Sequence, residues 1–558
     1  MKKKAIWLMA CLMAFLIVLA ACGNNGDTEE NGDVTGGSNG NGEPATGEEG
    51  NLAIPDIPGF PLETPMTISV LGRHVGVADW EDMPFWQAMT EATNISWEFT
   101  LPPNDDFLTN LNLAFATQNL PDVLFGSALT SAQQVEHGSV GTLIPLQDLI
   151  AEHAPNIQRL LDENPTIRTS ITAPDGNIYA LPTIDQSFSA IWPVGPVYFN
   201  GTWMEALDAE IPTTLDEFTD LMFRFRDEMP EILGVDQVFP ISATDEMQWL
   251  RLWMLSFWGM TTRTIEATDG VVVHNVTTDA YRAYLEWMHM AFEEGLIHPE
   301  IYTLSHDHHN ALGGDNLVGF FQSWHSNGFL QTDEEQALDN PMLRPLTSEF
   351  SEGVLPRSTG FSPGQFAITN NAADPVTIIR WIDWLYTEEG AIFADHGPEG
   401  AFWVYEAHAE TGEQVRVFTP GVDPEDGHAR ARFTPYFGFP GPQLIPAEGP
   451  RILRDAAQSL ETPLDDFLRE ETRATVYTYG RVPIPTVMFT PEEADAVAII
   501  NADLLLEMDM QEASFVTGIT PLNDETWAEF LATLDQIGMQ ELVAAWQAAY
   551  DRWLEASS

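Results

Sequence analysis

The first fifty residues cannot join a packed core, and this limits what the chain can fold into. Lys2, Lys3 and Lys4 precede an apolar run, Ala5 to Ala20, which has the length of a signal-peptide core and is short for a bilayer span. The next stretch, 23–51, is dense in Gly, Asn, Asp and Glu and cannot bury enough apolar surface to offset its ordering entropy. We expect a signal peptide over 1–21, a disordered tether over 22–53, and a folded body only beyond them.

The junction between signal and tether contains a distinctive cysteine. The stretch from Leu19 to Cys22 resembles the bacterial lipobox, in which the cysteine thiol receives a diacylglyceryl group and the chain is cut just before it. The resemblance implies that Cys22 is the mature N-terminus and carries acyl chains such as palmitate, which hold the protein at a membrane surface. The predicted location is the extracellular face of the cell membrane. The alternative is an ordinary secretory signal with a chance cysteine.

Length and charge narrow the classes open to the body. About 500 residues exceed one compact domain, so two or more lobes are expected. Cys11 would leave with the signal and Cys22 would carry lipid, which leaves no disulfide or cysteine-based metal site. The mature chain has 20 arginines, no lysine and 84 acidic residues, a formal charge of −64. Such a charge excludes nucleic acid as a partner and indicates an acidic surface, adapted to salty or alkaline medium or produced by codon drift.

Helical and strand patterns alternate along the body, as in α/β proteins. Capping-box pairs open two helices, Thr214 with Glu217 and Thr490 with Glu493. The other predicted elements are a strand in 66–74, a helix in 82–94, a helix from the N-cap Asn104 to about Thr117, a strand in 122–126, and two terminal helices beginning near Asp524 and Met539.

A collinear series of short motifs resembles one family, the extracellular solute-binding lipoproteins of sugar ABC importers, and within it the alginate-oligosaccharide-binding proteins. The motifs cover nearly the whole mature chain, and they are NLPDVLFG (119–126), IPLQDLIAEHAPNI (144–157), APDGNIYALP (173–182), VYFNGTWMEAL (197–207), TTLDEF (213–218), LSFWGM (255–260), AFEEGLIHPEIYT (291–303), GQFAITN (364–370), WIDWLYTEEG (381–390) and the terminal WAEFLATLDQIGMQELVAAWQAAYDRW.

The resemblance implies a two-lobe, periplasmic-binding-protein-like α/β fold with the ligand cleft between the lobes. It places the N-lobe at 54–183 and 364–405 and the C-lobe at 184–363 and 406–558. It implies a monomer without catalytic residues or cofactors, which captures an oligosaccharide and delivers it to the permease subunits of an ABC transporter. Such lobes close over the ligand by a hinge motion.

Candidate ligand contacts come from two sources. Sugars need flat aromatic platforms and a few polar groups, so tryptophans in Gly- or Pro-punctuated segments are favoured over those at helical spacing, which are expected in the core (Trp287, Trp381, Trp384, Trp546). The segment GRHVGVADW resembles the stretch where relatives place polar contacts. The resulting candidates are Arg73, His74, Trp80, Trp192, Trp258, Trp324 and Trp403, each with core packing or a surface loop as the alternative.

Two other functions stay open. A secreted glycoside hydrolase needs two carboxylates across a cleft, and 84 acidic residues make such a pair uninformative in sequence. A metal-binding lipoprotein is suggested by His306, Asp307, His308 and His309, although neighbouring side chains point in divergent directions.

Two further expectations concern ligands. Some relatives carry a calcium loop after the first capping-box helix, but the corresponding stretch from Arg226 to Asp236 has Pro230, Ile232 and Leu233 where ligands would alternate, so we expect no calcium site. The formal charge of −64 favours a neutral oligosaccharide over an acidic one, with Trp258, Trp324 and Trp403 among its stacking platforms.

Overall fold

The structure, a computed structural model, describes residues 52–557 apart from short gaps at 245–246, 424–425, 427, 439, 448–451, 454 and 459–462. The chain divides into two units, Met1–Glu49 and Gly50–Ser558, and all described residues belong to the second. The predicted signal peptide, Cys22 and most of the predicted tether lie outside the described residues.

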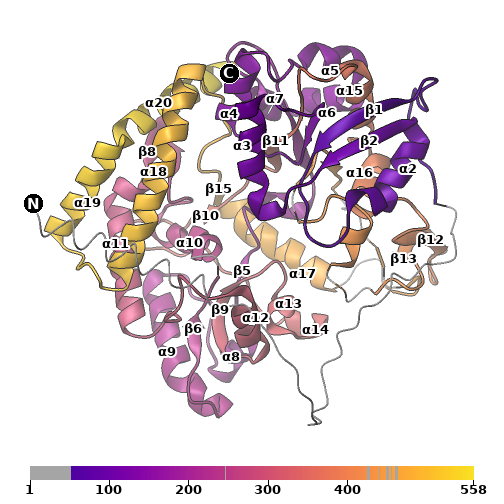
Figure 1. Cartoon of the computed structure of the whole chain (residues 1–558). Helices are drawn as coiled ribbons and strands as arrows, with labels where there is room; N and C mark the ends of the chain where they lie inside the picture. The colour runs from indigo at the N-terminus through magenta and orange to yellow at the C-terminus, as the bar shows by residue number, and fades with distance from the viewer. Residues whose placement is uncertain are drawn as a thin grey trace, which may run out of the picture. The chain divides into compact units, whose positions relative to one another are not determined.

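The larger sheet has six strands in the order β14-β4-β11-β3-β1-β2; three of them, β1, β2 and β11, are labelled in Figure 1. All pair in parallel except β11, which is antiparallel to both β3 and β4. The carboxyl ends of β1, β3 and β4 therefore lie at one edge. The strands are β1 (Met66–Leu71), β2 (Ile95–Thr100), β3 (Val123–Phe125), β4 (Leu181–Asp185), β11 (Phe361–Ile368) and β14 (Leu444–Ile445).

Both faces of the sheet are buried at β3, because its successive side chains point to opposite faces and all three are buried. In β3, Val123 and Phe125 join one core together with Trp86 and Trp381, while Leu124 joins a smaller core on the opposite side. The helices around the sheet are α2 (Pro84–Thr93), α3 (Phe107–Thr117), α4 (Ser131–Ser139), α5 (Gln147–His153), α6 (Pro155–Glu163), α7 (Pro165–Ile171), α15 (Pro375–Trp384) and α16 (Glu388–His396).

A second core surrounds a three-stranded sheet in the order β5-β9-β6. Here β6 is parallel to β9 and β5 is antiparallel to it. The strands are β5 (Val197–Phe199), β6 (Phe239–Ile241) and β9 (Val318–Gln322). The helices of this part are α8 (Gly201–Ala206), α9 (Leu215–Leu233), α10 (Gln248–Met254), α11 (Asp279–Glu293), α12 (His306–Gly314), α13 (Ser326–Leu330), α14 (Glu334–Ala337), α17 (Pro463–Thr472), α18 (Pro491–Val516), α19 (Asp524–Ile537) and α20 (Met539–Ser557).

The long helix α18 packs against α4, α11, α19 and α20. A buried charge network fixes it to α10: Glu512 accepts hydrogen bonds from Arg251 (2.6 Å) and from the Tyr281 hydroxyl (2.6 Å), and Arg263 lies 3.2 Å away. Glu512 is 1% exposed, so the two arginines replace the water that a carboxylate needs.

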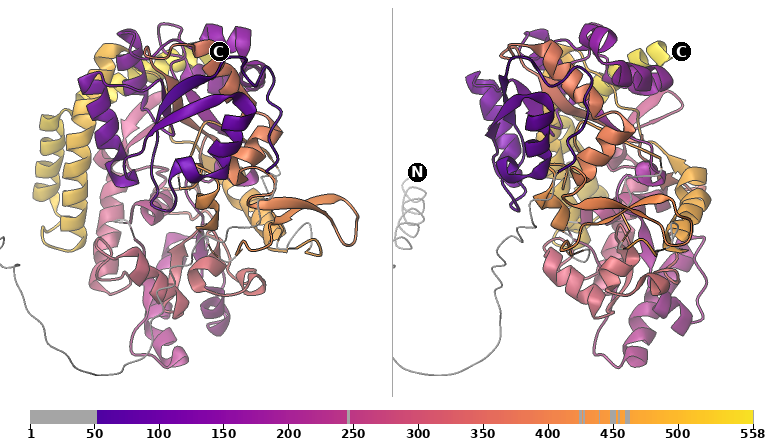
Figure 2. Two further views of the ribbon diagram at one scale, coloured as in Figure 1. Left: turned by 45° about the vertical axis from the view of Figure 1, so that its right-hand side comes forward. Right: turned by 90° about the vertical axis from the view of Figure 1, so that its right-hand side faces the viewer.

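Three two-stranded sheets complete the fold: β7 (Ile265–Thr268) with β8 (Val271–His274), β10 (Leu355–Pro356) with β15 (Gly480–Arg481), and β12 (Trp403–Ala407) with β13 (Gln414–Phe418). The β12–β13 hairpin extends away from its neighbours in the left view of Figure 2. No helix among the described residues is both long enough and apolar enough to span a bilayer.

The predicted two-lobe α/β fold class is confirmed. The capping boxes at Thr214 and Thr490 are present, and the terminal helices begin at Asp524 and Met539 as expected. One detail differs: Asn104 opens a short 3-10 helix, and Asp106 is the N-cap of α3. The residue boundaries of the lobes stay a prediction.

Candidate functional site

A cavity of about 580 Å³ lies where the strands of the second sheet end. Because β6 and β9 are parallel, the residues that follow them meet at one edge, and ligands of open α/β sheets bind outside such carboxyl ends. The start of β5 reaches the same edge. The described lining residues are Val194, Ala243, Thr244, Trp249, Leu250, His306, His309, Asn310, Gln322, Ser323, Trp324, Gly328, Phe329, Gly438 and Pro440.

Two tryptophans and Phe329 line this cavity with aromatic surface, and a third tryptophan packs against one of them. Trp324 and Trp249 are the two most exposed tryptophans of the described chain, at 55% and 41%, and both line the cavity. Behind Trp324 lies Trp192, with the ring centroids 6.3 Å apart, and Phe188 meets Trp192 edge-on at 5.6 Å. Trp192 is 5% exposed, and its buried Nε1–H has no hydrogen-bond partner among the described residues.

Amide, hydroxyl and imidazole groups supply the polar lining. Gln322 donates from Nε2 to the Gly195 carbonyl oxygen at 3.1 Å, and Trp253 donates to the same oxygen at 3.1 Å. Nδ1 of His309 lies 3.0 Å from the Ser242 hydroxyl, and its ring packs on Phe329. No Asp, Glu, Lys or Arg occurs among the described lining residues.

The loop after β1 borders the other side of this region. A Cβ built on the lining residue Gly438 would lie 3.6 Å from Cγ1 of Val75. Next to Val75, His74 accepts the Gly76 N–H at Nδ1 (2.9 Å), and its Nε2 lies 3.1 Å from an Asp79 oxygen. Arg73 donates from Nε to the Gly126 carbonyl (2.9 Å).

The guanidinium of Arg73 also stacks 4.3 Å above the ring of Phe107. Partial burial lowers the pKa of Arg73 from its ordinary value. The side chain is thus held at the carboxyl end of β1 by a backbone oxygen and an aromatic face.

The structure therefore brings Trp192 and Trp324 together and places the other predicted tryptophans elsewhere. Trp80 is 1% exposed and stacks on Trp86 within the first core. Trp258, 3% exposed, lines a separate cavity of about 640 Å³ together with Trp287 and Phe350.

Trp403 lies at a third cavity, of about 250 Å³, beside Ile54 and Tyr405. It is 6% exposed and donates from Nε1 to the Gly397 carbonyl oxygen at 3.1 Å. Like Trp80 and Trp258, Trp403 is therefore not among the described residues that line the cavity at the ends of β6 and β9.

Sequence reasoning missed Trp249, Asn310 and Gln322 as lining residues. Gln322 had a usable signal, because it is the first polar residue after the buried strand residues 318–321. Trp249 had none: it lies in the helical run QWLRLWM, where tryptophan usually indicates core packing.

The hypothesis of a histidine metal site meets unfavourable local geometry. His306, His308 and His309 lie in the first turn of α12 and diverge: His306 and His309 line the cavity, while the ring of His308 lies 6.0 Å from that of His298. The stretch corresponding to the calcium loop is helical as far as Leu233, and Arg226 pairs there with Asp227 and Glu294. Among the described residues no group of three or more potential ligand side chains is placed to hold a metal ion.

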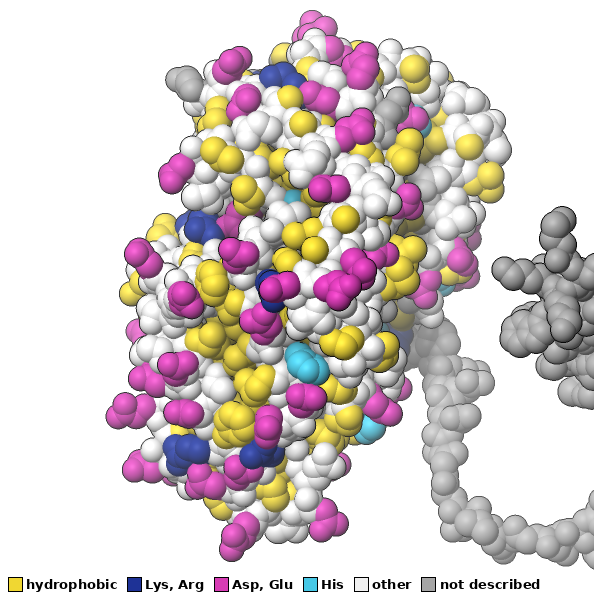
Figure 3. All heavy atoms as spheres, turned by 90° about the vertical axis from the view of Figure 1, so that its left-hand side faces the viewer, with side chains coloured by type: hydrophobic (Ala, Val, Ile, Leu, Met, Phe, Trp, Pro, Cys, Tyr) yellow, Lys and Arg dark blue, Asp and Glu magenta, His cyan; other side chains and the backbone are white. Residues whose placement is uncertain are grey.

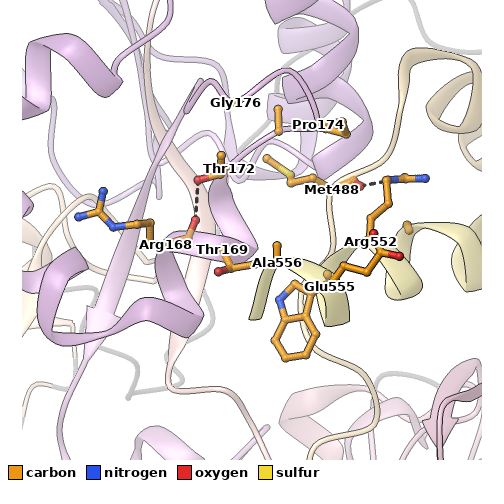
Figure 4. A pocket seen from close by; sticks show the side chains of 12 residues that line it. Arg168, Thr169, Thr172, Pro174, Gly176, Met488, Arg552, Glu555 and Ala556 are labelled. Carbon is orange, nitrogen blue, oxygen red and sulfur yellow. Dashed lines mark hydrogen bonds between the residues drawn. The ribbon is translucent and has the colours of Figure 1, made fainter. Parts of the chain in front are cut away.

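Another cavity of about 580 Å³ lies between the α7 region and α20 (Figure 4). Thr172 and Pro174 line one side, and Met488 and Arg552 line the other. Trp553 donates from Nε1 to the Ser170 hydroxyl at 3.1 Å, which joins α20 to α7. The arginines at this cavity are engaged in ion pairs, Arg168 with Asp162 and Arg552 with Glu493.

Comparison with known proteins gives consistent similarities. No known protein-family model matches the chain. The fructooligosaccharide ABC transporter substrate-binding protein FusA of Streptococcus pneumoniae is 22% identical over 520 residues, which span 88% of this chain and 92% of FusA.

Solved structures are similar over the same span. FusA in complex with kestose superimposes with a TM-score of 0.70 at 21% identity, covering 88% of this chain and 100% of FusA. The alginate-binding protein AlgQ2 gives 0.70 at 21% identity, covering 88% and 99%. An HMO-binding solute-binding protein from Bifidobacterium longum infantis gives 0.70 at 20% identity, covering 87% and 99%. The chain thus has the two-lobe α/β fold of ABC-transporter substrate-binding proteins, and its resemblance to the solute-binding proteins of sugar importers is confirmed.

Proposed function

We propose that this protein captures an oligosaccharide in the cavity at the ends of β6 and β9 and delivers it to the permease subunits of an ABC importer. The observation that carries the proposal is the coincidence of the most exposed tryptophans of the described chain, Trp324 and Trp249, with a 580 Å³ cavity at the carboxyl ends of parallel strands. Sugars present C–H faces that stack on indole rings and hydroxyls that pair with amides. The similarity to substrate-binding proteins over 88% of the chain supports this function over the hydrolase and metal-binding alternatives.

The direct test is calorimetry of the purified protein with a panel of oligosaccharides. Micromolar or tighter binding of at least one is expected. If a sugar ring stacks on Trp324, Trp324→Ala removes about 1–3 kcal/mol of binding free energy, the transfer value of a large apolar side chain. Tyr405→Ala is the matched control, because Tyr405 is 45% exposed but lines a different cavity. Equal losses in both variants would remove Trp324 from the site.

We assign the protein no catalytic role. The same oligosaccharides incubated with the protein should be recovered intact, and the appearance of shortened products would support the hydrolase instead.

The lipid anchor is a separate part of the proposal. We infer from the lipobox-like stretch before Cys22 that two or more acyl chains hold the protein on the outer face of the membrane. In cells of the source organism, Cys22→Ser should abolish incorporation of a palmitate analogue and move the protein from the membrane fraction to the medium. Retention of both in the variant would exclude Cys22 as the anchor.

A further inference from the structure

We propose that the cavity at the ends of β6 and β9 selects uncharged oligosaccharides and excludes those that carry carboxylates. This inference rests on the proposed function and specifies its ligand class. The related proteins do not decide the question, because FusA and the alginate-binding AlgQ2 are equally similar in fold and identity to this chain.

The first argument is the absence of a fixed cation from the described lining. An ionised carboxylate that leaves water for a cavity loses strong hydration, and a fixed cation is the partner that recovers most of this cost, whereas neutral donors recover less of it. The described lining has neither Arg nor Lys. Positions 245, 246 and 439, adjacent in sequence to lining residues but outside the described residues, are Asp, Glu and Phe and add no cation.

The second argument is that the two arginines next to lining segments are committed to other partners. Arg251 follows the lining residue Leu250 but is 7% exposed and bonded to Glu512. Arg73 precedes the loop that meets Gly438, and its guanidinium is held by the Gly126 carbonyl and the Phe107 ring. Turning either arginine toward a ligand would break a buried ion pair or a stacked, hydrogen-bonded contact.

The third argument is the chemistry that the cavity does offer. Trp324 and Trp249 present apolar faces, and Gln322 and Asn310 present amides, each with both donor and acceptor atoms. Hydroxyl groups also donate and accept, so amides satisfy them without any ionic partner. The lining thus matches the C–H faces and hydroxyls of a neutral sugar.

The negative net charge of the whole protein also disfavours acidic sugars, but salt can distinguish this long-range effect from the effect of the cavity lining. Asp and Glu side chains are spread over the face drawn in Figure 3, where Arg is sparse. Salt screens such long-range repulsion: the Debye length falls to about 3 Å at about 1 M ionic strength. Salt in solution does not supply the cation that a carboxylate would lack inside the cavity.

The test uses neutral and uronic oligosaccharides of equal length, titrated calorimetrically at about 0.05 M and about 1 M salt. We expect neutral ligands to bind with little salt dependence and uronic ligands to bind at least tenfold more weakly at both salt concentrations. Uronic binding equal to neutral binding at high salt would overturn the inference, because the net charge and not the cavity would then be the barrier. Failure of every oligosaccharide to bind would instead refute the proposed function.

A gain-of-function variant tests the local cause. Asn310→Arg places a cation in the lining at an exposed position of α12 and should strengthen uronic binding at least tenfold at both salt concentrations. Gln87→Arg is the matched control, since it adds the same charge at an exposed position of α2, outside the cavity. If both variants strengthen uronic binding equally, or if Asn310→Arg leaves it unchanged, the missing cation is not what excludes acidic sugars.

Discussion

Replacement of Glu512 by Gln should destabilise the protein more than any other single change of one carboxylate to its amide in α18. Glu512 is 1% exposed and contacts Arg251 at 2.6 Å, Arg263 at 3.2 Å and the Tyr281 hydroxyl at 2.6 Å. The Glu512→Gln variant would keep the shape of the side chain but leave two buried guanidinium groups without their shared counter-ion.

The magnitude follows from the cost of breaking a buried ion pair, about 3–5 kcal/mol. The entropy of unfolding is about 2.1 cal/mol/K per residue, or about 1 kcal/mol/K for about 500 residues. The expected drop in Tm is therefore about 3–5 °C when the unit unfolds cooperatively.

The pH dependence gives this prediction a second readout. Burial by itself would raise the pKa of Glu512, but Arg251 and Arg263 outweigh it and hold the pKa below the ordinary value. The network therefore stabilises the folded state fully above the unfolded pKa of about 4.3, and this contribution is lost as pH falls from there through the lowered folded pKa. The wild type and the variant should converge in stability under acid conditions.

Urea unfolding at neutral pH and at a series of pH values from about 4.3 downward measures both effects. Asp503→Asn is the matched control, an exposed carboxylate on the same helix. If Glu512→Gln unfolds within about 0.5 kcal/mol of this control at neutral pH, the range of ordinary surface changes, the network does not fix α18 as argued.

Three further outcomes are expected. Trp258→Ala should cost about 3–5 kcal/mol of stability, measured by urea unfolding, because Trp258 is 3% exposed. It should leave oligosaccharide affinity unchanged, because Trp258 lines a different cavity from the one at the ends of β6 and β9. Gly364→Ala should lower Tm more than Gly176→Ala: both glycines have positive φ, but only a Cβ at Gly364 would collide with a backbone oxygen, that of Leu129 at 2.1 Å. Burial, with Arg263 nearby, lowers the pKa of His274 to about 4. The free energy of unfolding should therefore be highest above the unfolded pKa of about 6.5 and fall by about 3 kcal/mol as the pH drops to about 4, because only the unfolded state takes up the proton in that range. The variant His274→Gln should lose less stability over the same range in a pH series of urea unfolding curves.

The elements of the fold were largely predictable because their signals are local. Thr214 and Glu217 are three residues apart, and the side chain of each accepts a hydrogen bond from the backbone N–H of the other. The start of α9 can therefore be predicted without knowledge of tertiary contacts. Trp381 and Trp384, at helical spacing, are 0% and 4% exposed as expected of core residues. Asn104 misled because the chain makes one 3-10 turn, Asn104–Asp106, before α3 begins at Phe107.

The cavity was only partly predictable because its residues converge from distant segments. Trp324 follows β9 and Trp249 is the second residue of α10, and their presence at one cavity depends on the pairing of β6 with β9 and on the anchoring of α10 through Arg251. Glycine and proline neighbours selected Trp192, Trp258, Trp324 and Trp403 alike, but only Trp324 lines this cavity, because packing that one sequence does not reveal leaves the other three nearly buried.

The contact between Trp192 and Trp324 gives the protein an intrinsic optical reporter. Indole fluorescence shifts to shorter wavelength when water leaves the ring, and most of the described tryptophans are already shielded from water, whereas Trp324 is 55% exposed. A sugar that covers Trp324 changes the polarity around one indole and the energy transfer to its neighbour 6.3 Å away. Ligand occupancy should therefore be visible in the emission spectrum of the unlabelled protein, with the signal confined to this pair and to Trp249.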